Sequence, residues 1–289
     1  MISWIIIGRN WNKHLNKLTD AIKYQTADKN KYEIIIVDDN SVDQSINKLE
    51  AFCVKNSFVL IKNQSILGRG ASRNRGMQVA TNPWCLFSNN NTYPEPNLIQ
   101  SYLNKINNDI DVIAGSIKYE CKDDITFEKY LNSTNRGVNK YSQSDNIPFQ
   151  LVLFGNCVIK KNLLAATEGF NEKIVEYGGE ELELMWRITN KNPDIKIIKN
   201  NTYVIRKNHP SFVAHCNRMV EFGNNLNKNL PIELIQLIIP NLLNRFKWWI
   251  PTALGLQVLK CLYKTIPVFQ FKIIRLALGM AVLRGIKNE

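Results

Sequence analysis

The chain has 289 residues, of which 45% are hydrophobic and 21% are charged, and its formal net charge is +12. A chain of this size and composition can bury one sizeable core, which argues against wholesale disorder. Its six cysteines stand far apart and form no CxxC pair, so we expect reduced, buried thiols in a cytosolic protein. Met1 runs directly into the apolar ISWIII without a basic segment before it, so no signal peptide is expected.

Short apolar runs alternate with segments of helical spacing in the first 90 residues or so. The runs predict buried strands, which fall within residues 2–8, 32–41, 58–63 and 83–88. The segments between them predict helices, which fall within residues 11–26, 43–54 and 67–80. This alternation predicts a parallel sheet with helices on both of its faces.

The rest of the chain continues the alternation and then becomes mostly helical. We expect a helix over 97–106, a strand near 112–119, a long polar loop or lid over 120–147, a helix from about Glu180 and two short strands within 194–208. The predicted fold is therefore α/β, with a Rossmann-like, mostly parallel sheet and flanking helices. It is expected to occupy residues 1–225, and a helical basic tail follows over residues 226–289.

Polar residues follow two of the predicted strands at the edge where doubly wound sheets bind ligands. Asp38 and Asp39 end the second strand, and they either accept hydrogen bonds from a ribose or a base, or cap a solvated turn. Three amides, Asn89, Asn90 and Asn91, follow the fourth strand, at a place where many enzymes carry metal-binding carboxylates. The amides mark either a metal site without its charge or only a turn.

Two further segments combine glycines with charged side chains. Gly68–Gly76 contains three arginines that suit phosphate, although it lacks a Walker ending, and a turn with a solvated basic helix fits it equally well. In GGEELELMWR, Gly178 and Gly179 let the start of a helix approach a ligand closely. Glu180 and Glu181 then serve either as a general base or as charges that favour the helix dipole.

Five motifs in the right order resemble those of the inverting nucleotide-sugar glycosyltransferases of family 2, which have the GT-A fold. ISWIIIGRN resembles the opening strand SIIIPTYN, and IIIVDDNSVD is similar to VVDDGSTD. The longer motifs begin at NQSILGRGASRNRG and at FGNCVIKKNLLAATEGF, and the last is NHPSFVAHCNRMVEFG. The resemblance spans about residues 2–223.

The resemblance implies a nucleotide site in the first half of the chain. Asp39, with Asp38 beside it, would hold the uracil or ribose of a UDP-type donor. Arg73 would contact the nucleotide side of the pocket. Arg69 and Arg75 are nearby cations for the diphosphate.

The resemblance also places a metal motif on the amides. Asn89 and Asn91 stand where the family has two aspartates that bind Mn²⁺ or Mg²⁺, and hard cations prefer anionic oxygens. Three interpretations stay open: a weakly bound metal held by Asn91, the diphosphate and His209; arginines that neutralise the diphosphate without metal; or a relative that is not catalytic.

A general base follows from the same resemblance. Glu181 stands where the family has an aspartate that deprotonates the acceptor hydroxyl, and its extra methylene moves the carboxylate by about 1.5 Å. Glu180 and Arg187 would shape the acceptor side together with Gly178 and Gly179. Trp186 would stack on a sugar face or pack in the core.

The last 49 residues carry eight basic residues against one acidic residue. Apolar clusters, cations and aromatics alternate there, as in NRFKWWIP, and no stretch of about 20 residues is free of charge and proline. We expect amphipathic helices that lie on the inner face of the cytoplasmic membrane, or a helical subdomain that packs on the core or forms a homo-oligomer. Nucleic acid is not expected as a partner, because no nucleic-acid motif accompanies the charge.

These features together indicate a peripheral membrane glycosyltransferase on the cytoplasmic side. We expect it to move a sugar with inversion from a nucleotide-diphosphate donor, such as a UDP-sugar, to a hydroxyl of a glycan or lipid-linked acceptor. Such a reaction belongs to surface-polysaccharide or glycolipid synthesis. The alternative is a degenerate relative that binds nucleotide sugars or acts as a scaffold.

Overall fold

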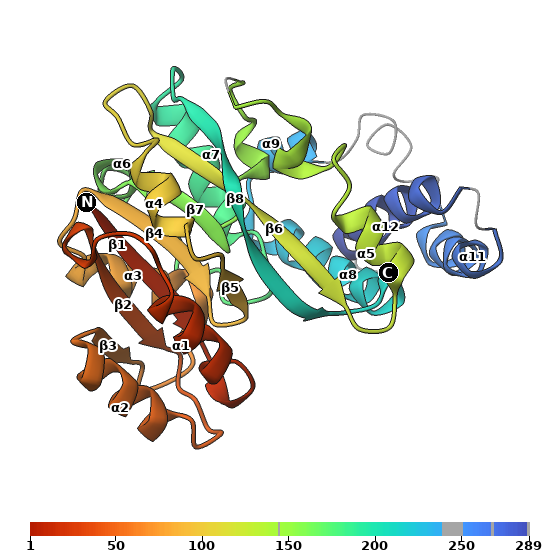
Figure 1. The fold of residues 1–289 in the computed structure, drawn as a ribbon. Helices are drawn as coiled ribbons and strands as arrows, with labels where there is room; N and C mark the ends of the chain where they lie inside the picture. Colours follow the sequence, from red (N-terminus) through yellow and green to blue (C-terminus); the bar gives the residue numbers. More distant parts are fainter. Residues whose placement is uncertain (144, 239–250, 267–268, 288–289) are drawn as a thin grey trace. The chain divides into compact units, whose positions relative to one another are not determined.

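A computed structural model of the chain describes residues 1–143, 145–238, 251–266 and 269–287 (Figure 1). The described residues form two compact units. The first consists of Met1–Tyr119, Thr134–Val175 and Glu180–Lys207, and the second of Glu120–Ser133, Glu176–Gly179 and Asn208–Glu289. The functional boundary expected at residue 225 stays a prediction.

The first unit is built on a mixed sheet with the strand order β3-β2-β1-β4-β7-β6-β8-β5 (Figure 1). The strands are β1 (Ile2–Gly8), β2 (Tyr32–Asp38), β3 (Val59–Lys62), β4 (Trp84–Asn89), β5 (Thr92–Pro94), β6 (Val112–Cys121), β7 (Asn156–Lys160) and β8 (Ile197–His209). β1, β2, β3 and β4 pair in parallel, as expected. β7 pairs antiparallel with β4 and β6, and β5 pairs antiparallel with β8. The predicted α/β class is confirmed, but one long strand replaces the two short strands expected within 194–208.

Helices cover both faces of this sheet because its strands alternate apolar side chains between two cores. Trp4 and Ile6 of β1 belong to one buried cluster, and Ile5 and Ile7 belong to the other. The first cluster includes side chains of α1 (Leu15–Lys23), α2 (Ile46–Asn56) and α4 (Leu98–Leu103). The second includes side chains of α6 (Lys161–Ala166) and α7 (Glu180–Lys191), with Met77 of α3 (Gly68–Val79) packed against it.

The register of the parallel strands brings the polar strand ends to one edge. Asp38 pairs with Gly8 and with Lys62, and Asn89 pairs with Ile7. The carboxyl ends of β1, β2, β3 and β4 therefore meet at the edge where open α/β sheets bind ligands.

The second unit is helical. Its helices are α5 (Ile125–Leu131), α8 (Phe212–Asn229), α9 (Ile232–Ile238), α11 (Thr252–Thr265) and α12 (Gln270–Lys287). α8 and α12 approach closely through glycines, since a Cβ on Gly223 would lie 3.0 Å from the Cα of Gly285. The predicted helical C-terminal region is thus present. Residues 244–250 of the NRFKWWIP motif lie outside the described residues.

Within the part of the chain that the structure describes, every helix is too short or too polar to cross a lipid bilayer.

Candidate active site

Asp38 fixes the end of β2 from inside the protein. Its side chain is buried and accepts a hydrogen bond from the indole Nε1 of Trp11 at 2.7 Å. It also accepts hydrogen bonds from the backbone N–H of Ser41 at 3.0 Å and from the Ser41 hydroxyl. These contacts hold the loop after β2 in place, so Asp38 stabilises the end of the strand from the buried side.

Asp39 joins the same strand end to the start of α3. One carboxylate oxygen accepts hydrogen bonds from Asn63 Nδ2 and from the N–H of Leu67, both at 2.8 Å. The other accepts a hydrogen bond from the N–H of Gly68 at 3.0 Å. A carboxylate is favourable at a helix N-terminus, where backbone N–H groups lack partners. Asp39 therefore orients the glycine–arginine segment, and its predicted contact with a nucleotide stays a prediction.

Arg73 lies at the centre of a buried ion-pair network. Its side chain is 0% exposed, and its Nη2 lies 2.7 Å from Glu181 Oε1 and its Nη1 3.3 Å from Glu180 Oε1. Arg69 Nε lies 3.1 Å from the same Glu180 oxygen, and the Arg69 side chain is 37% exposed. Two cations thus meet two carboxylates, which offsets the cost of removing these charges from water.

Aromatic rings and an amide complete the surroundings of Arg73. Its guanidinium lies 5.4 Å from the ring centre of Phe154 and 5.2 Å from that of Phe170. Its Nη2 also donates to Asn89 Oδ1 at 3.4 Å, which links the network to the end of β4. Because the Arg73 side chain has no exposed surface, it acts by orienting the residues that it contacts.

Glu181 is the carboxylate of the network that reaches solvent. Its side chain is 20% exposed, whereas that of Glu180 is buried. Oε2 of Glu181 accepts a hydrogen bond from the backbone N–H of Phe154 at 3.0 Å, so both oxygens are held. This is the arrangement expected of a general base that is oriented by its neighbours. Phe154 could not be predicted as part of the site, because its contribution is a main-chain N–H that only the tertiary fold brings into place.

Arg75 points to the adjoining strand end and not to the ion-pair network. Its Nη1 donates a hydrogen bond to Asn63 Oδ1 at 2.8 Å, and Asn63 in turn donates to Asp39. The three predicted arginines of α3 therefore have three different surroundings. Only Arg69 and Arg75 keep exposed surface for a phosphate.

The amides after β4 do not form a set of metal ligands. Asn89 offers its oxygen to Arg73, and Asn90 turns away to donate to the carbonyl of Arg9 at 3.1 Å. Asn91 is half-buried. The described residues contain no group of three or more His, Cys, Asp or Glu side chains able to hold a metal ion. A guanidinium beside the Asn89 oxygen also repels a divalent cation, so these residues do not fit a metal held by protein groups alone.

His209 lies in the second unit, within an aromatic cluster. Its ring centre is 4.9 Å from that of His215 and 5.7 Å from that of Phe127, and its Nδ1 is 3.8 Å from Cys121 Sγ. The predicted metal pairing of His209 with Asn91 stays a prediction.

The predicted acceptor-side residues of α7 divide into two environments. The guanidinium of Arg187 is bound by Glu183 at 2.6 and 2.8 Å and by the carbonyls of Thr167 and Gly169. Arg187 thus secures α7 to the loop after α6. Trp186 is half-buried, and its role toward a sugar stays a prediction.

Gly178 and Gly179 form the turn before α7. Their φ angles are +85° and +98°, a region in which side chains other than glycine are strained. The carbonyl of Gly178 accepts a hydrogen bond from Asn225 Nδ2 within the second unit. Glycine is required here by the backbone, and contact of this turn with an acceptor stays a prediction.

The sequence was compared with models of known protein families. The sequence profile described as Glycosyl transferase family 2 matches residues 3–165, which is more than half of the chain.

Curated relatives match parts of the chain. It is 30% identical over 120 residues to the poly(ribitol-phosphate) beta-glucosyltransferase of Bacillus spizizenii, a match that covers 40% of this chain and 19% of that protein. It is 24% identical over 157 residues to the glycosyltransferase AglE of Haloferax volcanii, covering 53% of this chain and 51% of AglE. The chain thus spans about half or less of the lengths of these relatives.

Solved structures share the fold over almost the whole chain. The mannosyltransferase PcManGT of Pyrobaculum calidifontis, in complex with GDP-Man and Mn²⁺, gives a TM-score of 0.67 at 13% identity, with 99% of this chain and 86% of that chain covered. A fragment of S. aureus TarS in complex with UDP gives 0.61 at 16% identity, with 99% and 90% covered. These likenesses establish the GT-A fold.

Proposed function

Because the chain belongs to glycosyl transferase family 2, we propose that it transfers a sugar in the synthesis of a polysaccharide or glycolipid. One observation carries the proposal. The partly exposed Glu181 carboxylate is held by Arg73 and by the Phe154 N–H, in a network that also reaches Asn89 at the carboxyl end of β4. A proton acceptor is thereby fixed next to the sheet edge where a nucleotide donor is expected.

The proposed reaction uses that geometry. Glu181 takes the proton of the acceptor hydroxyl while the hydroxyl oxygen forms its bond to the anomeric carbon of the donor sugar. The bond from that carbon to the nucleotide diphosphate breaks, and its electron pair leaves with the diphosphate. Attack opposite the leaving group inverts the anomeric centre. Arg73 and the Phe154 N–H act by positioning Glu181, since neither is placed to take up the proton.

Cations of α3 offset the charge of the departing diphosphate. Arg69 is the partly exposed cation of the network, and Arg75 lies on the same helix beside Asn63. Guanidinium groups bind phosphate oxygens in bidentate fashion, so they can neutralise this leaving group. No step of the proposed reaction is assigned to a divalent cation, because the amides after β4 do not fit one.

We propose a UDP-sugar as the donor. TarS, which shares the GT-A fold, was solved in complex with UDP, and Asp39 stands where the resembled motif binds a uracil or ribose. PcManGT instead binds GDP-Man, so a guanine donor is the natural comparison.

The decisive experiment presents the protein with a panel of UDP- and GDP-sugars and measures release of the nucleotide diphosphate. We expect release with at least one donor, and its loss in Glu181→Gln. Glu176→Gln, a change at an exposed glutamate, is the matched control and is expected to keep full activity. Absence of turnover and of donor hydrolysis throughout the panel contradicts the proposal.

A non-catalytic, donor-binding relative is the second candidate. It is favoured by the amides at Asn89–Asn91 and by the engagement of Asn89 with Arg73. Calorimetry separates the two functions. Donor binding that is unchanged in Glu181→Gln, together with no turnover by the native chain, supports the second candidate.

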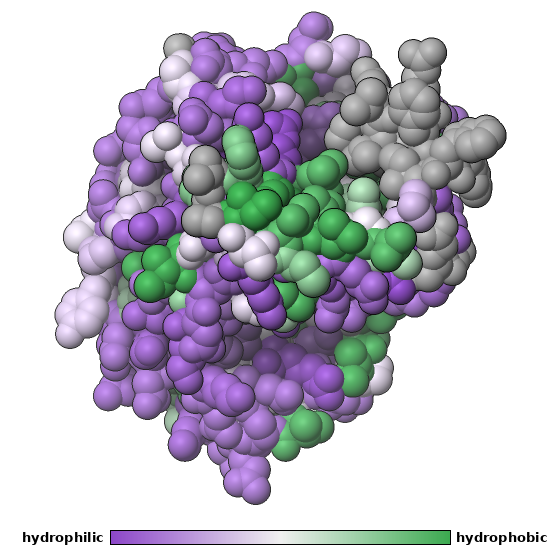
Figure 2. Space-filling view, turned by 90° about the vertical axis from the view of Figure 1, so that its right-hand side faces the viewer, coloured by the Kyte–Doolittle hydropathy of each residue, from purple (hydrophilic) through white to green (hydrophobic). Residues whose placement is uncertain are grey.

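We further propose that the helical second unit contacts an anionic membrane surface on the cytoplasmic side. Figure 2 displays a face on which hydrophobic side chains gather beside hydrophilic ones. Leu254 and Val258 of α11 are 62% and 48% exposed and stand one turn apart, and Phe271 and Leu276 of α12 are also exposed. Exposed cations accompany them, namely Lys264, Lys272 and Arg275. This pairing suits a lipid headgroup interface, where lipid-linked acceptors reside.

A further inference from the structure

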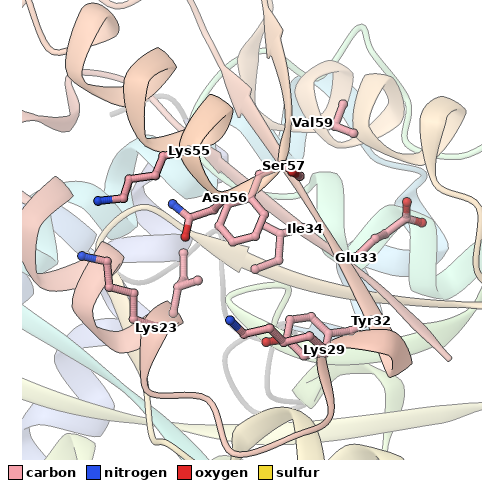
Figure 3. Close-up of a pocket in the computed structure, with 11 residues that line it drawn as sticks. Lys23, Lys29, Tyr32, Glu33, Ile34, Lys55, Asn56, Ser57 and Val59 are labelled. Carbon is pink, nitrogen blue, oxygen red and sulfur yellow. The ribbon is translucent and has the colours of Figure 1, made fainter.

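A cavity lies in the first unit, away from the carboxyl edge of the sheet. It has a volume of about 520 Å³ and opens where β2 and β3 begin (Figure 3). That volume falls within the range of small-molecule sites. Tyr32 lines it and starts β2, whereas Asp38 ends the same strand. The seven residues of β2 span about 20 Å from the end at Tyr32 to the end at Asp38. A ligand in this cavity is therefore distinct from a donor at Asp39.

Three lysines from three different elements frame this cavity. Lys23 ends α1, Lys29 belongs to the 3-10 turn Lys29–Lys31, and Lys55 lies in the last turn of α2 (Figure 3). All three are exposed, and the ion pairs found among the described residues involve none of them. Three cations around one opening produce a positive potential that attracts anions.

Among the described residues, the carboxylate at the cavity wall forms no ion pair with these lysines. Glu33 accepts hydrogen bonds from the Ser3 hydroxyl at 2.5 Å, from the Thr81 N–H at 2.6 Å and from Asn82 Nδ2 at 3.1 Å. Burial alone would raise its pKa, but these hydrogen bonds hold the pKa of Glu33 below its ordinary value. In Figure 3 its carboxylate points away from the side where Lys23 and Lys55 lie.

The floor of the cavity is apolar and aromatic. Ile22 and Ile34 are buried, and Phe58 is half-buried and meets Phe52 edge-on with ring centres 5.5 Å apart. Burial raises the pKa of the Tyr32 phenol, so its hydroxyl stays protonated and can donate a hydrogen bond. A ligand that fills this space must therefore combine an apolar body with a negative charge.

We propose that this cavity binds a small phosphate ester with an aromatic or apolar group. Lysine ammonium groups are compact point charges that suit phosphate oxygens. The phosphate would lie among Lys23, Lys29 and Lys55, and the apolar group would cover Phe58 and Ile34. Neither an inorganic anion nor a neutral aromatic satisfies both halves of the site. This site is independent of the proposed sugar transfer.

Calorimetry of the full chain with phenyl phosphate tests the proposal, with inorganic phosphate and benzyl alcohol as the two half-probes. We expect one saturable site for phenyl phosphate, weaker binding of inorganic phosphate, and no binding of benzyl alcohol. The triple variant Lys23→Gln, Lys29→Gln, Lys55→Gln should lose about tenfold in affinity, because each exposed charge contributes modestly. Lys31→Gln, an exposed neighbour that does not line the cavity, should bind like the native chain.

Amide chemical shifts locate the bound probe. Phenyl phosphate should shift the backbone amides of Asn56, Ser57 and Val59, which line the cavity. The proposal is overturned if no saturable binding occurs, if the triple variant binds as well as Lys31→Gln, or if the shifts map to Asp39 and Asn63 instead. Because no readout involves sugar transfer, these results stand whether or not the chain is a transferase.

Discussion

Arg73 Nη2 lies 2.7 Å from Glu181 Oε1, and the Arg73 side chain is completely buried while that of Glu181 reaches solvent. The arginine therefore lies on the buried side of the carboxylate. It holds Glu181 from the protein side and binds the buried Glu180 with its other terminal nitrogen. The general base proposed for transfer is thus positioned by a buried charge, and the predicted contact of Arg73 with a nucleotide stays a prediction.

Replacing Arg73 should be far more costly than replacing Arg69. Arg73→Met leaves the buried Glu180 with one cation and Glu181 with none, so we expect a loss of about 3–5 kcal/mol in the free energy of unfolding. Arg69→Gln removes a cation that is 37% exposed, and it should cost about 1 kcal/mol or less. Urea unfolding followed by circular dichroism measures both. Equal losses in the two variants would show that the buried network does not stabilise the fold in this way.

Replacing the amides after β4 with carboxylates should change the affinity of the protein for Mn²⁺. Asn89→Asp combined with Asn91→Asp supplies two anionic oxygens, and we expect Mn²⁺ affinity in the presence of UDP to rise by about tenfold or more. Asn90→Asp adds one charge at a side chain that faces the Arg9 carbonyl, so it should leave Mn²⁺ affinity unchanged. Calorimetry reports the affinities. An unchanged affinity in the double variant contradicts the placement of a diphosphate at this strand end.

The sequence motifs correctly predicted which polar residues lie at the carboxyl edge of the sheet, because the end of a strand can be recognised from the residues next to it. Asp38, Asp39 and Asn89 follow apolar runs, and the parallel register then brings them to one edge. The partners of Arg73 were not predictable in the same way. Glu180 and Glu181 lie 107 and 108 positions further along the chain, and nothing local to either segment reveals the pairing.

The single strand β8 shows a second limit of local patterns. Two short strands are expected from the sequence within residues 194–208, but β8 runs unbroken from Ile197 to His209. In the fold Asn200 is buried, and its amide donates to the hydroxyls of Ser101 at 2.8 Å and Thr202 at 2.9 Å. These partners satisfy the polar side chain, so the strand continues through it.

Thiol chemistry tests the predicted burial of the cysteines. Five of the six are buried and Cys261 is exposed. Burial raises the pKa of Cys85 to about 12 and that of Cys53 to about 11, so little thiolate forms at either near neutral pH. We expect one equivalent of a disulfide reagent to react rapidly at about pH 8, and none in Cys261→Ser. Rapid reaction of two or more thiols in the folded chain contradicts this burial.

Vesicle binding tests the membrane proposal. Leu254→Ser, Val258→Ser and Phe271→Ser together remove apolar area that would be buried in the headgroup region, and each such side chain contributes roughly 1.5–3 kcal/mol when fully buried. Co-sedimentation with vesicles rich in phosphatidylglycerol should therefore fall by about tenfold or more. Val42→Ser with Val54→Ser removes apolar side chains of the first unit that are even more exposed, at 71% and 81%, and should have no effect. Equal binding of the two variants, or no binding of the native chain, contradicts the proposal.

Asp124 joins three helices of the second unit and should be important for its stability. Its carboxylate accepts hydrogen bonds from the N–H of Phe127 at 3.0 Å, from the N–H of Phe212 at 2.9 Å and from the hydroxyl of Tyr263. It thereby caps α5, anchors the start of α8 and holds α11. Burial and the hydrogen bond to this carboxylate raise the pKa of Tyr263 far above its ordinary value, so the phenol remains a donor.

Asp124→Ala leaves two N–H groups and one hydroxyl without their acceptor. We expect a loss of about 2–4 kcal/mol in the free energy of unfolding, seen as an earlier urea transition of the helical signal. Asp124→Asn keeps one acceptor oxygen and should lose about half as much. Asp123→Ala changes the exposed neighbour and should stay within about 0.5 kcal/mol of the native chain. If Asp124→Ala unfolds at the same urea concentration as Asp123→Ala, the carboxylate does not hold these helices together.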